Sequence, residues 1–158
     1  MKKPQDSVAK VAGALRELGV NTEVLTFSQS TKTSQEAADA AGCELAQIAK
    51  SIVFRAKSAD KAVLVITSGV NRVDTKLIRD HLGEKPDKAD ADFVREKTGY
   101  VIGGVPAIAH KEEPIVFLDE TLMEFTEIWS AAGSPYSIYK ITPQELLRIT
   151  GAKVIRVC

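Results

Sequence analysis

The sequence is poor in the residues that build metal sites and disulfide frameworks. Its 158 residues include only two cysteines, Cys43 and Cys158, and two histidines, His81 and His110. These separations do not match the ligand spacing of a zinc site, and two distant cysteines do not make a disulfide framework. We therefore expect free thiols, no bound metal and no other cofactor.

Long apolar runs are also missing. The longest, AVLVITSGV from residue 62, is far shorter than the roughly 20 residues that a membrane-spanning helix needs. The N-terminal segment MKKPQDSVAK carries two lysines but no apolar stretch behind them, so we expect no secretory signal. These features predict a cytoplasmic protein that does not contact a membrane.

Neither sign of charge is in excess, because the chain has 21 Lys and Arg residues and 21 Asp and Glu residues. No overall field attracts nucleic acid, so any RNA contact has to be local and sensitive to salt. The sequence has no internal repeat, low-complexity tract or linker. Its length is enough for one sizeable core, and we expect residues 1–158 to form one domain.

Helical and strand patterns follow one another along the chain. Apolar residues recur at helical spacing over residues 7–18, with Ser7 as the N-cap and Gly19 at the end. Further helices are expected at 33–42, 74–83, 90–99 and 142–151, and a helical turn or two at 43–50. Strands are expected at 22–27, 51–56, 61–69, 100–104, 113–119, 135–141 and 153–158.

The segment KAVLVITSG has no polar alternation, which is typical of a central strand covered on both faces. Several connections are too short for the right-handed crossovers of a parallel sheet. The pattern therefore predicts an α/β (α+β) fold, with a mixed and largely antiparallel sheet of about six strands surrounded by helices.

The stretch TGYVIGGVPAIAH, residues 98–110, ends a strand-like run in two glycines and a proline. It matches neither the Walker nor the dinucleotide-binding pattern. A β-bulge or a tight turn is the simple interpretation. The alternative is a small apolar cradle, stiffened by Pro106, in which the N–H groups of Gly103 and Gly104 face a developing negative charge.

Four side chains are candidates for chemistry outside that loop. Lys50 is expected near a helix end, where lysines are usually solvated, but its apolar neighbours also fit a lysine directed at an anionic group. Cys43 has no histidine close in sequence to activate it, which favours a structural thiol. His81 lies on a basic helix and is expected to be solvated, whereas His110 follows the loop and could reach a site there.

Together, the loop and the lysine resemble the YbaK/prolyl-tRNA synthetase-associated editing-domain family. The matching segments IAKSIVFRA, AVLVITSG, NRVDTKLIRDHLG, TGYVIGGVPAIAH and WSAAGSPYSIYKITPQEL occur in the family's order and cover essentially the whole chain. The lysine before the apolar strand and the TGY-x-x-GG-x-P stretch are the most specific parts. Two departures, Ile108 for the loop's closing glycine and Ala131–Gly133 for a Ser-Gly-Gly turn, would make the presumed pocket more apolar.

The resemblance implies a free-standing aminoacyl-tRNA deacylase, which hydrolyses the ester between a small amino acid and tRNA. Alanine, cysteine and serine are the expected amino acids, tRNA-Pro is the expected carrier, and prolyl-tRNA synthetase is a candidate partner. The substrate's own ribose hydroxyl or a positioned water would replace a protein base. The resemblance sets no particular oligomeric state.

The same resemblance assigns roles to residues. Lys50, Gly103 and Gly104 would be catalytic, and Lys50 would act by its charge, or as a base if burial lowers its pKa. The substrate would be held by Val105, Pro106, Ala107, Ala131 and Gly133. Contact with the tRNA acceptor stem would come from Lys76, Arg79 and Lys85.

Two other functions stay open. The cradle could hold an aminoacyl end or a small ligand without hydrolysing it, which would make the protein a binding module. An unrelated small-molecule hydrolase that uses Cys43 or His110 is the weaker alternative.

Overall fold

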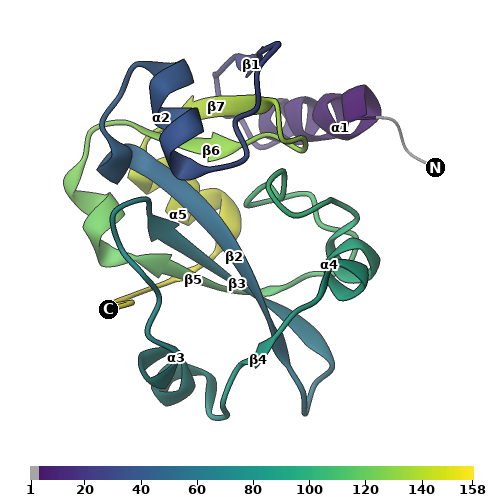
Figure 1. Cartoon of the computed structure of the whole chain (residues 1–158), viewed down its shortest axis with the longest axis vertical. Coiled ribbons are helices and arrows are strands. Elements are labelled where there is room, and N and C mark those ends of the chain that lie inside the picture. Colours follow the sequence, from purple (N-terminus) through teal and green to yellow (C-terminus); the bar gives the residue numbers. More distant parts are fainter. Residues whose placement is uncertain (1–3) are drawn as a thin grey trace.

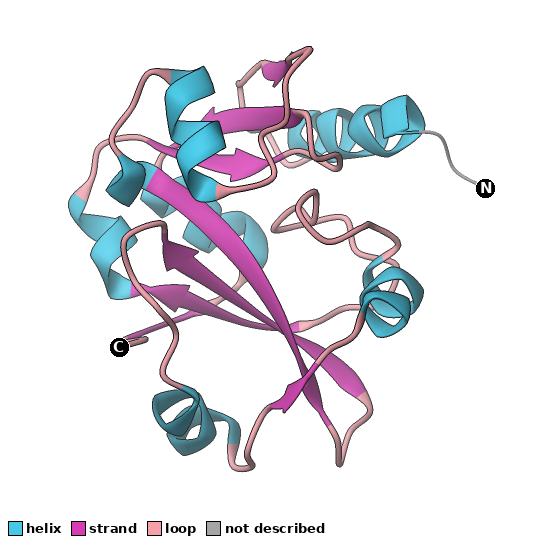
Figure 2. Cartoon of the chain, in the orientation of Figure 1, coloured by secondary structure: helices cyan, strands magenta, loops and turns pink. Residues whose placement is uncertain are grey.

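The computed structural model describes residues 4–158 and contains one eight-stranded mixed sheet with helices against both faces (Figures 1 and 2). The helices are α1 (Pro4–Glu17), α2 (Ser34–Ala41), α3 (Thr75–Leu82), α4 (Ala91–Thr98) and α5 (Pro143–Thr150), with short 3₁₀ turns η1 (Leu45–Gln47) and η2 (Glu120–Glu124). The strands are β1 (Val24–Thr26), β2 (Ile48–Ala56), β3 (Lys61–Ser68), β4 (Asp87–Lys88), β5 (Ile115–Asp119), β6 (Ile128–Ala131), β7 (Ser137–Ile141) and β8 (Lys153–Ile155).

The strand order is β1-β7-β6-β2-β3-β5-β8, with β4 beside β2. The pairs β1–β7, β6–β7, β2–β3 and β2–β4 are antiparallel, whereas β2–β6, β3–β5 and β5–β8 are parallel. The predicted α/β fold with a mixed sheet is therefore confirmed. The sheet has eight strands where about six were expected, because β4 and β6 are short and carry no clear alternation.

The predicted central strand is β3, which is buried along almost its whole length. Leu64 and Ile66 pack into the main core with side chains of α1 and α5. Val63 and Val65 point to the other face and pack against Ile78 of α3. Each such side chain contributes roughly 1.5–3 kcal/mol through burial, so β3 anchors both layers.

The strand β2 has a free edge in its middle. Its pairing with β6 ends at Ala49, and its pairing with β4 begins at Phe54. Between these points residues 50–53 pair with β3 alone. A segment of one sheet edge therefore remains open in the interior of the fold, between β2 and β6.

Most predicted helix boundaries are confirmed by their caps. Thr33 and Glu36 form a complete capping box at the start of α2, and Gly42 ends that helix with φ 70°. The first helix differs, because α1 begins at Pro4 and places Ser7 inside the helix rather than at its N-cap. The expected helical turns at 43–50 shrink to η1, since Ile48 already belongs to β2.

The strand expected at 100–104 does not form. The N–H of Gly104 donates to the carbonyl of Val101 at 3.0 Å, which closes a turn instead. Gly103 has φ 91°, a left-handed conformation that glycine adopts without strain. The apolar and β-branched residues there suggested a strand, but no neighbouring strand is available to pair with them.

Candidate functional site

A hollow of about 60 Å³ lies at the open edge of β2. Its walls come from the N-terminal end of α2, from β2, β6 and β7, and from the turn at Gly103–Val105. Figure 1 shows these segments meeting in the upper half of the molecule. A hollow of this size holds on the order of two water molecules, so it accepts only a small group.

Four of the predicted site residues meet at this hollow. Lys50, Gly103, Val105 and Ala131 all line its wall. Lys50 lies within β2 rather than at a helix end, and its side chain is half-buried. Within residues 4–158 its ammonium group has no ion-pair partner. A positive charge and a glycine turn therefore face the same small space.

The other predicted loop residues lie outside the wall. Pro106 and Ala107 are buried, and Ala107 packs into the main core. Gly133 has φ 100°, and a Cβ there would come within 2.8 Å of the Ser7 carbonyl oxygen in α1. The structure thus gives Gly133 a packing function, and neither Pro106 nor Ala107 is placed to touch a group in the hollow.

Gly104 is not placed as an anion donor either, because its N–H already donates to Val101. A Cβ at Gly104 would lie 2.7 Å from the carbonyl carbon of Ser134, so glycine is needed there for close packing of two backbones. The N–H of Gly103, by contrast, has no hydrogen-bond partner in the part of the chain that the structure describes.

The wall residues that the sequence analysis did not assign to the site include Lys32, Ser34, Ser51 and Ser130. The stem of Lys32 crosses Gly103, where an added Cβ would come within 2.5 Å of the lysine Cγ. Ser51 and Ser130 adjoin the predicted Lys50 and Ala131, but the alternation of a continuous sheet would place neighbours on opposite faces.

The open edge of β2 explains how neighbours can share one hollow. The N–H of Gly69 donates to the carbonyl of Ile48, which fixes the alternation of the β2–β3 ladder. The backbone groups of Lys50 consequently turn toward β3, and those of Ser51 turn toward the open edge. Ser51 therefore presents a main-chain N–H where β6 no longer pairs with β2.

The two departures from the family pattern, at Ile108 and at Ala131–Gly133, were expected to make the pocket more apolar, and only one of them does so. Ala131 lines the wall, but Ile108 is buried in the main core, away from the hollow. The left-handed backbone of this loop falls one residue later, at Ala109, with φ 63°. The serine hydroxyls make the wall more polar than its sequence suggested.

The two histidines and Cys43 lie away from the hollow. His110 Nε2 lies 2.6 Å from the Pro106 carbonyl oxygen, and burial lowers the pKa of His110. This contact joins two residues of the same loop and stabilises its conformation. Burial raises the pKa of the Cys43 thiol, which keeps it protonated and a poor nucleophile. His81 is exposed at the end of α3.

The basic residues Lys76, Arg79 and Lys85 are exposed on and just after α3. Figure 1 places α3 at the lower end of the molecule and α2 at the upper end. The structure does not bring these cations to the hollow, and their contact with tRNA stays a prediction.

Searches for a metal cluster and for a membrane span gave negative results. Over residues 4–158, no group of three His, Cys, Asp or Glu side chains is arranged to hold a metal ion. None of the helices described has the length and apolar content to cross a bilayer.

Sequence comparison finds related proteins. The model of the aminoacyl-tRNA editing domain matches residues 28–149. The uncharacterized protein YwhH of Bacillus subtilis (strain 168) is 36% identical over 137 residues, which cover 86% of this chain and 87% of YwhH.

Solved structures also include proteins that are similar to this chain. A crystal structure of a proposed trans-editing enzyme for prolyl-tRNA synthetase is 39% identical, with a TM-score of 0.90 over 99% of this chain and 98% of that one. The crystal structure of hypothetical protein APE2540 is 27% identical, with a TM-score of 0.86 over 94% and 98% of the two chains.

Proposed function

The chain belongs to the aminoacyl-tRNA editing domain family, and on that premise we propose that it hydrolyses mischarged aminoacyl-tRNA in the hollow at Lys50. The observation that carries this proposal is the meeting of Lys50, Gly103 and the open edge of β2 at one small cavity. The 39% identity to a proposed trans-editing enzyme for prolyl-tRNA synthetase supports tRNA-Pro as the carrier.

Hydrolysis of the ester passes through a tetrahedral intermediate with a negatively charged oxygen. The unpaired N–H of Gly103 and the N–H of Ser51 at the open edge are the donors that we assign to this oxygen. One such donor contributes roughly 3 kcal/mol to the transition state. Lys50 adds a fixed positive charge beside them, and its half-buried position strengthens that charge's effect.

In the described part of the chain, the wall of the hollow offers no histidine or carboxylate as a general base, and we assign Lys50 a role through its charge. Among the described residues that line it there is no histidine, aspartate, glutamate or cysteine. The proton of the attacking water therefore has to be taken by the substrate, and the ribose hydroxyl next to the ester is the nearest suitable group. This arrangement makes positioning and electrostatics the main contributions of the protein.

The tRNA end enters from the exposed side of the hollow. Lys32 and Thr33 are exposed there, and α2 begins at the same point. We assign Lys32 to the terminal phosphate, because a flexible ammonium group can follow a phosphate on a mobile strand. The more distant cations Lys76, Arg79 and Lys85 remain a proposed weak contact with the rest of the tRNA.

The direct test is a panel of mischarged substrates. Purified protein is incubated with alanyl-, cysteinyl- and seryl-tRNA-Pro, and with correctly charged prolyl-tRNA-Pro as the control. We expect release of at least one of the small amino acids well above the uncatalysed rate, and no release of proline. Tight binding of the charged tRNAs without hydrolysis would contradict the proposal and favour a binding module.

A further inference from the structure

Three serine hydroxyls on the wall of the hollow have no hydrogen-bond partner. The Oγ atoms of Ser34, Ser51 and Ser130 are buried, and the described part of the chain provides none of them with a donor or acceptor. Six side-chain polar atoms are in this state across residues 4–158. Half of them therefore gather around one cavity of about 60 Å³.

Several buried hydroxyls elsewhere in the described part of the chain are paired. Ser68 donates to the carbonyl of Ala46 at 2.7 Å, and Thr98 donates to that of Val94 at 2.6 Å. Thr67 donates to the buried carboxylate of Asp119 at 3.0 Å. A fold that satisfies these groups but leaves three serines unpaired around a cavity points to a partner from outside the chain.

Of the three serines, Ser130 lies deepest in the hollow, whereas Ser34 begins α2 nearer the entrance. Ser130 is 1% exposed, whereas Lys32 at the entrance is exposed. Ser130 pairs in register with Ala49, so the side chains of Ser51 and Ser130 point to the same face of the sheet. A tRNA has to stay outside with its phosphate and ribose, which leaves the inner end for the acyl side chain.

The phenol of Tyr139 interacts with the Ser130 hydroxyl, but no hydrogen bond of normal geometry joins the two groups. Tyr139 lies opposite Ser130 in the β6–β7 ladder, and its hydroxyl is also buried without a hydrogen bond among the described residues. Burial raises the pKa of Tyr139 to about 12, while the interaction with the Ser130 hydroxyl acts in the opposite direction. Tyr139 therefore stays a neutral phenol behind the wall.

We propose that the hydroxyls of Ser34, Ser51 and Ser130 bind the side chain of the acyl group, so that the hollow selects a small hydroxyl-bearing amino acid. Seryl esters are then preferred to alanyl esters of the same tRNA. This inference rests on the proposed function and names its substrate class. The volume fits a CH₂OH group, since it holds on the order of two water molecules.

Seryl esters are preferred because a seryl side chain can pair with the serine hydroxyls of the hollow and an alanyl side chain cannot. A seryl hydroxyl provides both a donor and an acceptor for the serines, whereas an alanyl methyl group leaves them buried and unpaired. A site built to hydrogen-bond a substrate hydroxyl rejects the analogue that lacks it strongly. We expect kcat/KM for seryl-tRNA to exceed that for alanyl-tRNA by roughly 100-fold, which corresponds to leaving one buried hydroxyl unpaired.

The test compares seryl- and alanyl-tRNA-Pro on the native protein and on Ser130→Ala. The inference expects the variant to lose at least tenfold on the seryl ester and little on the alanyl ester. Ser137→Ala is the matched control, because Ser137 is buried but pairs with Ser134 at 2.9 Å away from the hollow. It should leave the ratio of the two rates unchanged.

Equal loss on both esters would overturn the inference, because the hydroxyls would then bind a group that all aminoacyl esters share. Equal rates on the native protein would overturn it as well and leave the deacylase proposal intact. If neither ester is hydrolysed, the proposed function fails. Binding of 3′-serylamino- and 3′-alanylamino-3′-deoxyadenosine then still tests selection, and equal affinity would overturn it. Ser51→Ala repeats the comparison if Ser130→Ala does not fold.

Discussion

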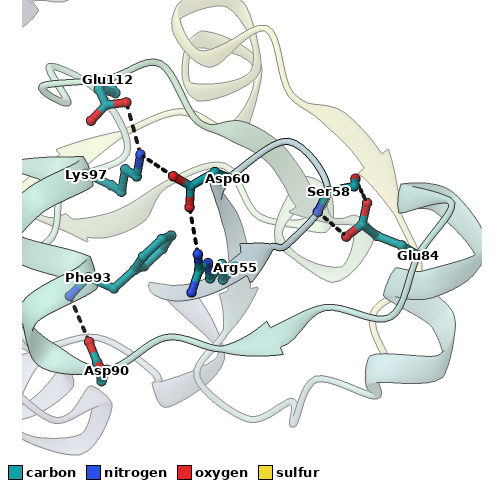
Figure 3. Close-up of polar contacts among 8 residues, drawn as sticks. All are labelled: Arg55, Ser58, Asp60, Glu84, Asp90, Phe93, Lys97 and Glu112. Atoms are coloured by element: carbon teal, nitrogen blue, oxygen red, sulfur yellow. Dashed lines mark hydrogen bonds and ion pairs between the residues drawn. The ribbon is translucent and has the colours of Figure 1, made fainter.

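The two ends of β2 differ in whether their charged side chain forms an ion pair. Lys50, near the start of the strand, has no ion-pair partner among the described residues and lines the hollow. Arg55, near its end, lies 2.9 Å from Asp60, and its guanidinium sits over the ring of Phe93 at 5.3 Å (Figure 3). One strand therefore carries a cation without an ion-pair partner at one end and an ion-paired cation at the other.

The engaged end belongs to a larger network. Asp60 also pairs with Lys97 at 3.4 Å, and Lys97 pairs with Glu112 at 3.3 Å (Figure 3). These contacts connect the β2–β3 turn to α4 and to the segment after it. The hollow shows the reverse pattern, with a lysine and three hydroxyls unpaired. The comparison separates polar groups that hold the fold together from polar groups kept available for a ligand.

The largest expected effect comes from Lys50→Met. This change removes the positive charge at the hollow but keeps much of the side-chain stem, so we expect deacylation to fall roughly 100–1000-fold. The free energy of unfolding should stay within about 0.5 kcal/mol, because no ion pair is lost. Single-turnover deacylation and urea unfolding measure the two quantities. A normal rate would remove Lys50 from the mechanism.

A smaller effect of the opposite kind is expected from Arg55→Met. The variant loses the ion pair with Asp60 and the contact with Phe93, which together contribute on the order of 1 kcal/mol. We expect Tm to fall by roughly 2–4 °C with an unchanged deacylation rate. A large loss of activity with unchanged Tm would show that the two ends of β2 are not functionally distinct.

Much of the fold was predictable because local signals and burial agree. The helix expected at 33–42 and the unbroken apolar run of β3 were read directly from residue types and spacing. The segment at 100–104 misled because β-branched residues favour a strand only when a neighbouring strand can pair with them. Here Gly104 closes a turn instead.

The site was predictable only in part, for a topological reason. Lys50 and Gly103 were candidates from their local sequence, a family resemblance assigned them catalytic roles, and both line the hollow. Ser51 and Ser130 were not, because no local pattern shows that β6 leaves β2 after Ala49. The partner of each sheet edge depends on contacts that are distant in sequence, and the unpaired hydroxyls become visible only once that edge is known.

The central claim is that an aminoacyl group binds in the hollow between Lys50 and Gly103. A crystal structure with 3′-serylamino-3′-deoxyadenosine, a non-hydrolysable analogue of the charged tRNA end, tests it most directly. We predict the seryl group at the open edge of β2, with its hydroxyl within hydrogen-bond distance of Ser51 or Ser130. An analogue bound elsewhere, for example behind the loop beside His110, would contradict the account.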